Sequence, residues 1–388
     1  MITLISTTNR HVPYPKPSGY MFTYDLDAKK VLQKNTIIEV PYLKENPNPR
    51  GGMRGLKGFS IYKDRIAFVT SSTIFIYDKH WNPITYFFHP SAASIHELVL
   101  TEEHVWVTGT SCDQLLCFDY QGNLVKNLDV RKMDSVKNVT GWKTRPFLTD
   151  KQVHEGYIDF RDPRTHDLVE TDKAHINSLT VMKNGDLLVS LGLLKNSDFS
   201  TLLAIKYKLL RWGIWQYIVS FNAFLRKKVF TKVTETKGEM LIQPAKGYSV
   251  VIRVDKDLNV RPVLSFFGSS VPSHSARELA DGTAIYLNST DGELIHFNPD
   301  TGDILFRDKI GSKFLRGARE LPDGSLLLGD GNSFFHYDLK EHKVISRNKF
   351  TDEDAPSVFD FCPLPEGFDV PPISFHEHHE KLMPVKQV

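Results

Sequence analysis

Short runs in which hydrophobic and polar residues alternate follow one another along most of the chain, and tight-turn residues separate them. The alternation has the period of two that a half-buried β-strand requires, and each run is about five to eight residues long. Two successive segments, 274–306 and 316–346, repeat the same order of strand, Asp-Gly turn, strand, loop, strand, turn and strand. Four antiparallel strands in roughly 40 residues are the length of one β-propeller blade.

The same order of strands and turns occurs in three further copies upstream. Segments 57–88 and 95–128 each carry a complete copy. Segment 175–193 supplies two strands of a third copy, and 248–267 supplies the other two after a long insertion. Equivalent positions at the ends of third strands hold residues that we expect to form turns: Asp78, Asp119 and Asn298.

The two ends of the chain each carry part of a sixth copy. Segment 357–367 has the pattern of a first strand and its turn, after which the repeat stops. Segments 1–7, 19–26 and 30–40 have the pattern of second, third and fourth strands with no first strand before them. Joining these parts removes the open sheet edges that a propeller would otherwise leave. The sequence therefore predicts an all-β, six-bladed β-propeller whose N-terminal and C-terminal strands form one blade.

Two insertions and a tail interrupt this regular pattern. We expect residues 1–370 to form a single propeller domain, which is large for one domain but usual for closed β architectures. The first insertion, 130–174, is polar and contains proline, and we expect loop structure around 159–167. The second, 196–247, is expected to be a helical insertion in blade three. Residues 371–388 form a proline-punctuated C-terminal tail.

Composition and charge narrow the classes of function. The chain has 48 Lys and Arg against 46 Asp and Glu, a net charge of +2, so there is no general positive field to favour nucleic acid. Three cysteines are too few for a disulfide framework or a zinc ribbon, and we expect Cys112 and Cys117 to be buried. The first 17 residues lack the basic and apolar regions of a secretory signal, so we expect a cytoplasmic protein.

Residues at the start of the innermost strand of each blade converge on the axis of a propeller, and here most of them are imidazoles or cations. Blade by blade they are Arg54 and Lys57, His96, His175 with Asn177, His274, Arg316 and Ser357. A packed core would not collect such residues, so we predict an axial pocket. Its catalytic residues would be His96, His175 and His274, and its substrate-binding residues Arg54, Lys57, Asn177 and Arg316. The alternative is a wet channel in which the histidines satisfy strand-end carbonyls.

This set of side chains suits two kinds of chemistry. In the first, histidine acts as a nucleophile or as a general acid and base, and the guanidinium groups bind a small anionic or aromatic substrate. In the second, the three imidazoles form a facial site for a divalent Zn, Fe or Cu ion. Glu97 follows His96 but should point to the opposite strand face, which makes it a poor fourth ligand. Arg277 with Glu278 and Arg319 with Glu320 repeat further along their strands, and we expect them to form ion pairs between blades.

Two short motifs resemble those of the arylsulfate sulfotransferase family. The run His175-Ile-Asn-Ser-Leu resembles that family's HxNS motif, and the segment from His274 to Gly282 resembles its later histidine with the turn that follows. The likeness covers blades three to five and implies a six-bladed fold in which a central histidine transfers a sulfuryl group from an aryl sulfate to a phenol. His175, Asn177 and His274 match by motif, and Arg316 would hold the anion. Members of that family are exported, whereas this N-terminus shows no export signal.

The second insertion contains an apolar segment with basic flanks. No acidic residue occurs between Asp198 and Glu235, and Lys and Arg contribute seven positive charges there. The segment 209–225 is predicted to be an apolar helix, too short and too charged to span a membrane. Its large aromatic residues include Trp212, Trp215, Phe221 and Phe224.

Such a helix has three uses that the sequence leaves open. Residues 205–230 could bind an anionic membrane surface, so that the protein is peripheral at the membrane, or they could cover a lipophilic substrate. Alternatively, the helix packs on the propeller or in a homodimer interface.

Three functions follow from these observations. The first is an enzyme, a transferase or a lyase, that uses the axial histidines and cations on a small-molecule substrate. The second is a metalloenzyme with His96, His175 and His274 as ligands and a lipophilic substrate. The third is a non-catalytic propeller that binds protein partners.

Overall fold

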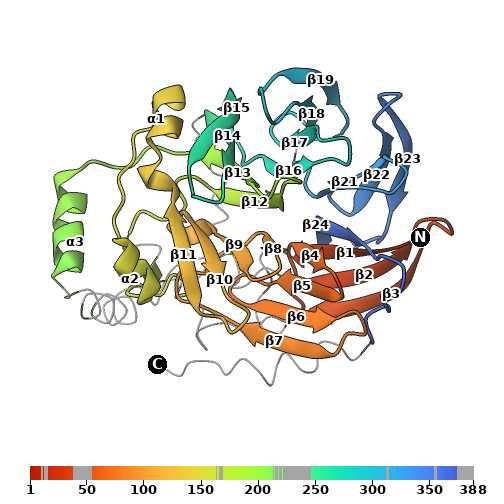
Figure 1. The fold of residues 1–388 in the computed structure, drawn as a ribbon, viewed down its shortest axis with the longest axis horizontal. Helices are drawn as coiled ribbons and strands as arrows, with labels where there is room; N and C mark the ends of the chain where they lie inside the picture. Colours follow the sequence, from red (N-terminus) through yellow and green to blue (C-terminus); the bar gives the residue numbers. More distant parts are fainter. Residues whose placement is uncertain are drawn as a thin grey trace.

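Six β-sheets surround one axis in the computed structural model, and each sheet is one blade of a propeller (Figure 1). The structure describes residues 1–9, 12, 16–37, 55–162, 164–165, 169–212, 214, 217, 221, 246–311, 314–353 and 356–373. Within these residues each of the six sheets has four antiparallel strands. The predicted six-bladed architecture is confirmed.

The blades follow one another in chain order. Blade one contains β4 (Phe59–Tyr62), β5 (Arg65–Val69), β6 (Ile74–Asp78) and β7 (Pro83–Phe87), and blade two contains β8 (Leu98–Leu100), β9 (Val105–Gly109), β10 (Gln114–Phe118) and β11 (Leu124–Asp129). Blade three contains β12 (Ile176–Val181), β13 (Leu187–Leu194), β14 (Gly247–Val254) and β15 (Val260–Ser269). Blade four contains β16 (His274–Glu278), β17 (Ala284–Asn288), β18 (Glu293–Phe297) and β19 (Ile304–Lys309), and blade five contains β20 (Ala318–Glu320), β21 (Leu326–Asp330), β22 (Ser333–Asp338) and β23 (Lys343–Lys349).

The sixth blade joins the two ends of the chain, as the sequence predicts. Its strands are β24 (Pro356–Pro363), β1 (Ile2–Asn9), β2 (Gly19–Asp25) and β3 (Lys30–Ile37), in that order from the inside outwards. β24 pairs with β1 from Thr3 opposite Pro363 to Asn9 opposite Pro356. The innermost strands contact one another in sequence around the axis, and β24 contacts β4 to complete the ring.

One polar side chain at the end of the third strand stabilises the last turn of every blade. Its oxygen accepts a hydrogen bond from a backbone N–H two residues later, which is an Asx turn. Across the six blades these residues are Asp25, Asp78, Asp119, Asp255, Asn298 and Asp338. The predicted role of Asp78, Asp119 and Asn298 is therefore confirmed. Apolar side chains fill the spaces between neighbouring blades, and Cys112, Cys117 and Cys362 are buried and free.

The first insertion contains short helices ahead of the segment 159–167 that the sequence predicts to be a loop. It forms a 3-10 helix, η2 (Val130–Lys132), and two short helices, α1 (Asp134–Thr140) and α2 (Asp150–His154). Thr149 and Gln152 form a capping box at the start of α2. This local cap favours the start of α2, a helix that the polar composition did not indicate.

The second insertion contains α3 (Thr201–Arg211), which begins before the predicted helix at 209–225. Asp198 accepts a hydrogen bond from the Ser200 backbone N–H ahead of the helix, where a carboxylate favours a helix start. Of the predicted helix, the structure describes residues 209–212, 214, 217 and 221. Among the described residues no helix is long and apolar enough to cross a membrane.

Candidate functional site

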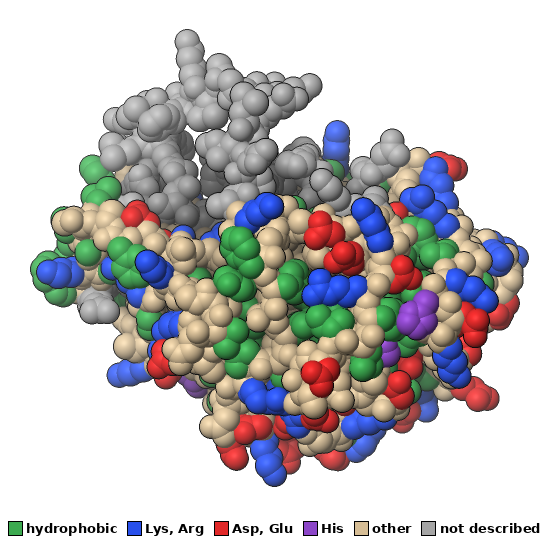
Figure 2. Space-filling model, turned by 90° about the horizontal axis from the view of Figure 1, so that it is seen from above, with side chains coloured by type: hydrophobic (Ala, Val, Ile, Leu, Met, Phe, Trp, Pro, Cys, Tyr) green, Lys and Arg blue, Asp and Glu red, His purple; other side chains and the backbone are tan. Residues whose placement is uncertain are grey.

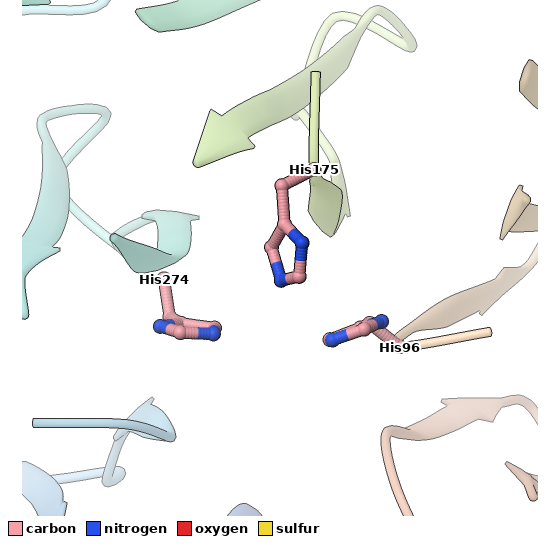
Figure 3. A group of neighbouring side chains, drawn as sticks. All are labelled: His96, His175 and His274. Atoms are coloured by element: carbon pink, nitrogen blue, oxygen red, sulfur yellow. The ribbon is translucent and has the colours of Figure 1, made fainter. Parts of the chain in front are cut away.

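Three histidines from three consecutive blades meet at the propeller axis. His96 lies two residues before β8, His175 directly precedes β12, and His274 is the first residue of β16. One nitrogen from each ring lies within 4.8 Å of the corresponding nitrogens of the other two rings. Figure 3 shows the three rings pointing toward a shared space from separate strands. The structure thus brings together all three histidines that the sequence predicted to converge.

A backbone carbonyl and a hydroxyl hold the ring of His96. Its Nδ1 lies 2.7 Å from the carbonyl oxygen of Ser94, which can only accept, so Nδ1 carries the hydrogen. The same nitrogen lies 3.0 Å from Oγ1 of Thr110, a hydroxyl that donates to the carbonyl of Ile176. His96 is thereby oriented from both its own blade and blade three.

A carboxylate orients His175. Its Nδ1 lies 2.8 Å from Oδ1 of Asp172. The segment that carries both residues is anchored by Asp113, whose carboxylate accepts hydrogen bonds from the backbone N–H groups of Lys173 and Ala174. Arg131 forms a buried ion pair with Asp113 at 2.6 Å. The position of His175 therefore depends on a buried ion pair from the preceding blade.

A hydroxyl orients His274. Its Nδ1 lies 3.0 Å from Oγ of Ser289, and that hydroxyl donates to the carbonyl of Leu315 over 2.7 Å. Because the Ser289 proton is used in this second bond, its oxygen accepts from the His274 ring. All three imidazoles thus carry a hydrogen on Nδ1, and in their neutral forms Nε2 carries the lone pair.

Left-handed backbone conformations occur at the start of these three strands. The φ angles are 52° at Ser94, 47° at His175 and 61° at Ser275. Non-glycine residues in this region cost of order 1 kcal/mol each and concentrate at functional sites. The surrounding hydrogen bonds keep the histidines in positions that the local chain would not adopt by itself.

Two cations and an aromatic ring form the other half of the axial ring. The guanidinium carbon of Arg316 lies 3.4 Å from the centroid of the Phe359 ring, and Nζ of Lys57 lies 5.9 Å from the same centroid. Lys57 also donates to the carbonyl of Ile95 over 2.6 Å. The ring centroids of His96 and Phe359 are 5.5 Å apart, so Phe359 connects the two halves.

The sequence analysis placed Ser357, not Phe359, at the axis in the sixth blade. The register between β24 and β1 shifts between Ser6 and Thr7, which leaves Phe359 as the extra residue of a β-bulge. A bulge re-aims the side chain that it carries, so counting alternate positions from the turn fails here. Asp172 and Ser289 were also missed. The one sequence feature that could have indicated Asp172 is its i, i+3 spacing from His175.

Electrostatics favours a neutral His96. Burial lowers the pKa of His96 well below its usual range, and the nearby charges of Lys57 and Arg316 act in the same direction. A neutral imidazole can accept a proton, attack an electrophile or bind a metal ion. The geometry therefore permits both kinds of chemistry that the sequence left open.

The remaining predicted site residues differ in their placement. Asn177 is buried, and its amide donates to the carbonyl of Ser273 over 2.7 Å, which links blades three and four. Its Oδ1 is buried and accepts no hydrogen bond from the described residues. Arg54, Trp215 and Phe224 lie outside the described residues. Trp212 and Phe221 are exposed on the surface, away from the buried histidines.

A buried ionic layer closes the axis beneath the histidines. Arg277 forms two hydrogen bonds with Glu97, each 2.6 Å long, and Glu97 also accepts from the backbone N–H of Leu179. Arg319 pairs with Asp360 at 2.8 Å. The expected ion pairs between blades are confirmed for both arginines, and the Arg277 pair occupies the carboxylate of Glu97. Glu278 and Glu320 instead accept hydrogen bonds from the backbone N–H groups of Lys183 and Ala280.

Phe59 brings the first blade into the same layer. Its backbone N–H donates to Asp360, and its carbonyl accepts from Arg319. With this residue every blade contributes to the layer. A cavity of about 760 Å³, lined in part by Arg319, lies beside the inner strands of blades one, five and six.

Comparisons with known proteins show the fold. No family model matches the sequence, and no curated protein matches it either. A protein of unknown function from Bacteroides caccae has a TM-score of 0.52 at 11% identity, over 94% of this chain and 100% of that one. A chain of a nidogen–laminin complex has a TM-score of 0.50 at 10% identity, over 92% and 97%. Virginiamycin B lyase from Staphylococcus aureus has a TM-score of 0.44 at 12% identity, over 78% and 72%. At such identities the likeness is one of propeller architecture.

Proposed function

We propose that this protein is a metal-dependent enzyme in which His96, His175 and His274 bind one divalent transition-metal ion through Nε2. The observation that carries the proposal is the convergence of one nitrogen from each ring within 4.8 Å, combined with an acceptor at every Nδ1. Metal-binding histidines almost always donate their other N–H to a carboxylate, carbonyl or similar group, which fixes the ring and raises its basicity.

The spacing of the three nitrogens suits an ion such as zinc after a small adjustment. Zinc–nitrogen bonds of about 2.0–2.1 Å in a tetrahedral site bring the nitrogens to about 3.3 Å from one another. Side-chain shifts of about 1 Å would close the present spacing. Three protein ligands leave coordination positions open for water and substrate, as in catalytic rather than structural sites.

Lys57 and Arg316 would then bind the substrate. Both are buried beside the imidazoles, and a guanidinium group holds a carboxylate, phosphate or sulfate with paired hydrogen bonds. The substrate class that fits is a small anion, and a metal-bound water would supply the nucleophile or base. Phe359 would position both cations through its ring.

Metal analysis of the purified full-length chain tests the proposal. We expect about one equivalent of zinc, iron or copper in the wild-type protein and loss of that metal in His96→Ala, His175→Ala and His274→Ala. His154→Ala is the matched control, because His154 is exposed on α2, and it should keep the metal. Equal metal content in all five proteins would contradict the proposal.

Metal-free histidine chemistry is the second candidate, and the two axial cations favour it. Positive charge from Lys57 and Arg316 opposes a metal cation and lowers the pKa of His96, so that His96 could act as a neutral nucleophile or base on an anionic substrate. This is the chemistry implied by the likeness to arylsulfate sulfotransferases. An assay of aryl sulfates, phosphates and carboxylate esters separates the candidates. Activity that persists after metal removal supports the second, and activity that needs added metal supports the first.

A further inference from the structure

We infer that the exposed face of α3 and the described apolar residues that continue it to Phe221 form a binding surface for membranes that contain anionic lipids. Exposed apolar residues are concentrated in this part of the chain. Seven of the 21 exposed large hydrophobic side chains among the described residues fall between positions 199 and 221. They are Phe199, Leu202, Ile205, Trp212, Ile214, Tyr217 and Phe221.

The exposed residues of α3 form a stripe on one side of the helix. When the helix is extended by one residue to Trp212 and each residue is turned by 100° around the helix axis, Leu202, Ile205 and Trp212 lie within about 80° of one another. Leu202 is 65% exposed and Trp212 is 70% exposed. Lys208, also exposed, flanks the stripe at about 40° from Trp212.

The opposite side of α3 packs against the protein. Tyr207 lies about 180° from the centre of the stripe and is buried. Its ring stacks on Phe147 at 6.0 Å, and the guanidinium of Arg145 lies 4.7 Å from it. The helix is therefore anchored by one face, and the apolar stripe points outward. Figure 1 shows α3 at the edge of the molecule beyond α2, and Figure 2 shows hydrophobic and basic side chains gathered at the same end.

Charge decides which partner this surface fits. The described helix, Thr201–Arg211, has no Asp or Glu and has three basic residues, Lys206, Lys208 and Arg211. Basic residues close to an anionic bilayer are attracted to its negative surface potential. Tryptophan and tyrosine prefer the membrane–water interface, and apolar side chains beside them enter the acyl boundary. An anionic lipid surface is complementary to both properties, whereas a second copy of the chain would bring the same positive charge.

Vesicle flotation with the full-length chain tests this inference. The variant Leu202→Ser/Ile205→Ser/Trp212→Ser removes the stripe but leaves Tyr207 in place. We expect the wild-type protein to float with phosphatidylcholine vesicles that contain phosphatidylserine, less so at high salt, and the triple variant to bind roughly tenfold more weakly or worse. Tryptophan emission of the wild-type protein should shift to shorter wavelength on binding.

The matched control removes three exposed apolar residues from the outer strands of blades three, four and five. It is Phe267→Ser/Leu305→Ser/Ile345→Ser, and it should bind vesicles like the wild-type protein. Circular dichroism confirms that each variant is folded. Equal binding by the triple variant, or binding to phosphatidylcholine alone that matches binding to the anionic vesicles, overturns the inference. The inference is also overturned if the wild-type and control proteins are dimers and the triple variant is a monomer, because the stripe is then a self-association face. None of these vesicle-binding results depends on bound metal, so membrane binding and the proposed enzymatic function can fail separately.

Discussion

Glu97 and Arg277 form a bidentate ion pair across the propeller axis, although they belong to blades two and four. Both side chains are buried, and Asp360 lies 3.7 Å from the same guanidinium. The pair lies one residue beyond His96 on one strand and three residues beyond His274 on another. It therefore ties together two blades that do not share a sheet.

Breaking this pair should destabilise the whole propeller. Glu97→Gln leaves the Arg277 charge buried with a weaker partner, which typically costs about 3–5 kcal/mol in the free energy of unfolding. Urea unfolding followed by circular dichroism measures the change. Glu102→Gln is the control, because Glu102 pairs with Lys63 on the surface, and it should unfold at the wild-type midpoint. Similar midpoints for all three proteins would show that the axial pair contributes nothing.

In the proposed metal site, Asp172 should control metal affinity without being a ligand. Asp172→Ala removes the acceptor at Nδ1 of His175, so the ring loses its fixed orientation. Loss of such a partner typically lowers metal affinity about 10-fold to 100-fold. Competition against a chromophoric chelator measures the affinity, and the stoichiometry should stay unchanged. Asp257→Ala, at an exposed turn residue, is the control and should bind like the wild-type protein. An unchanged affinity in Asp172→Ala would show that Asp172 does not orient the metal-binding ring.

Asp129 should make stability fall as the pH rises. Burial raises the pKa of Asp129 from its ordinary value of 3.8 to about 6. The folded protein then binds more protons than the unfolded chain between these values, so the free energy of unfolding decreases as the pH rises through that window. Asp129→Asn keeps the acceptor for the Arg131 backbone N–H but does not titrate.

The comparison of Asp129→Asn with the wild-type protein across pH 4 to pH 8 isolates this effect. Relative to the wild-type protein, the variant should gain about 1–3 kcal/mol between about pH 4 and pH 7. Denaturant unfolding at each pH measures the difference. A difference that does not vary with pH would contradict the raised pKa.

Gly329 should not tolerate a side chain. A Cβ at this position would overlap the carbonyl oxygen of Arg316 and the side chain of Val358, neither of which can move without disturbing two inner strands. Overpacking of this kind costs about 1–3 kcal/mol or more. Gly329→Ala should therefore unfold at lower temperature than the wild-type protein, as measured by thermal denaturation.

Gly185→Ala provides the comparison for Gly329→Ala. Gly185 has a φ of 88° and open space around its Cα, so its substitution adds conformational strain of about 1 kcal/mol and no overlap. Gly329→Ala should lower the unfolding temperature more than Gly185→Ala does. The reverse order would mean that the backbone around Arg316 adapts more easily than its packing suggests.

The sequence by itself determined the six blades, their turns and the closure across the chain ends. These features depend on interactions within one hairpin: alternation of apolar residues, an Asp or Asn at the last turn, and glycine where the backbone needs a positive φ. The convergence of His96, His175 and His274 also followed, because each histidine begins the inner strand of its own repeat.

Only the tertiary structure decided which other side chains complete the site. Phe359, whose ring contacts Arg316 and His96, is the extra residue of a bulge that β24 forms against β1, and the sequence does not show where in a strand a bulge occurs. The partner of Glu97 lies 180 residues away in the chain, and no local pattern selects it. Such pairs form only when the closed ring brings separate blades to one axis, since the free energy of a buried ion pair depends on its three-dimensional surroundings and not on its neighbours in sequence.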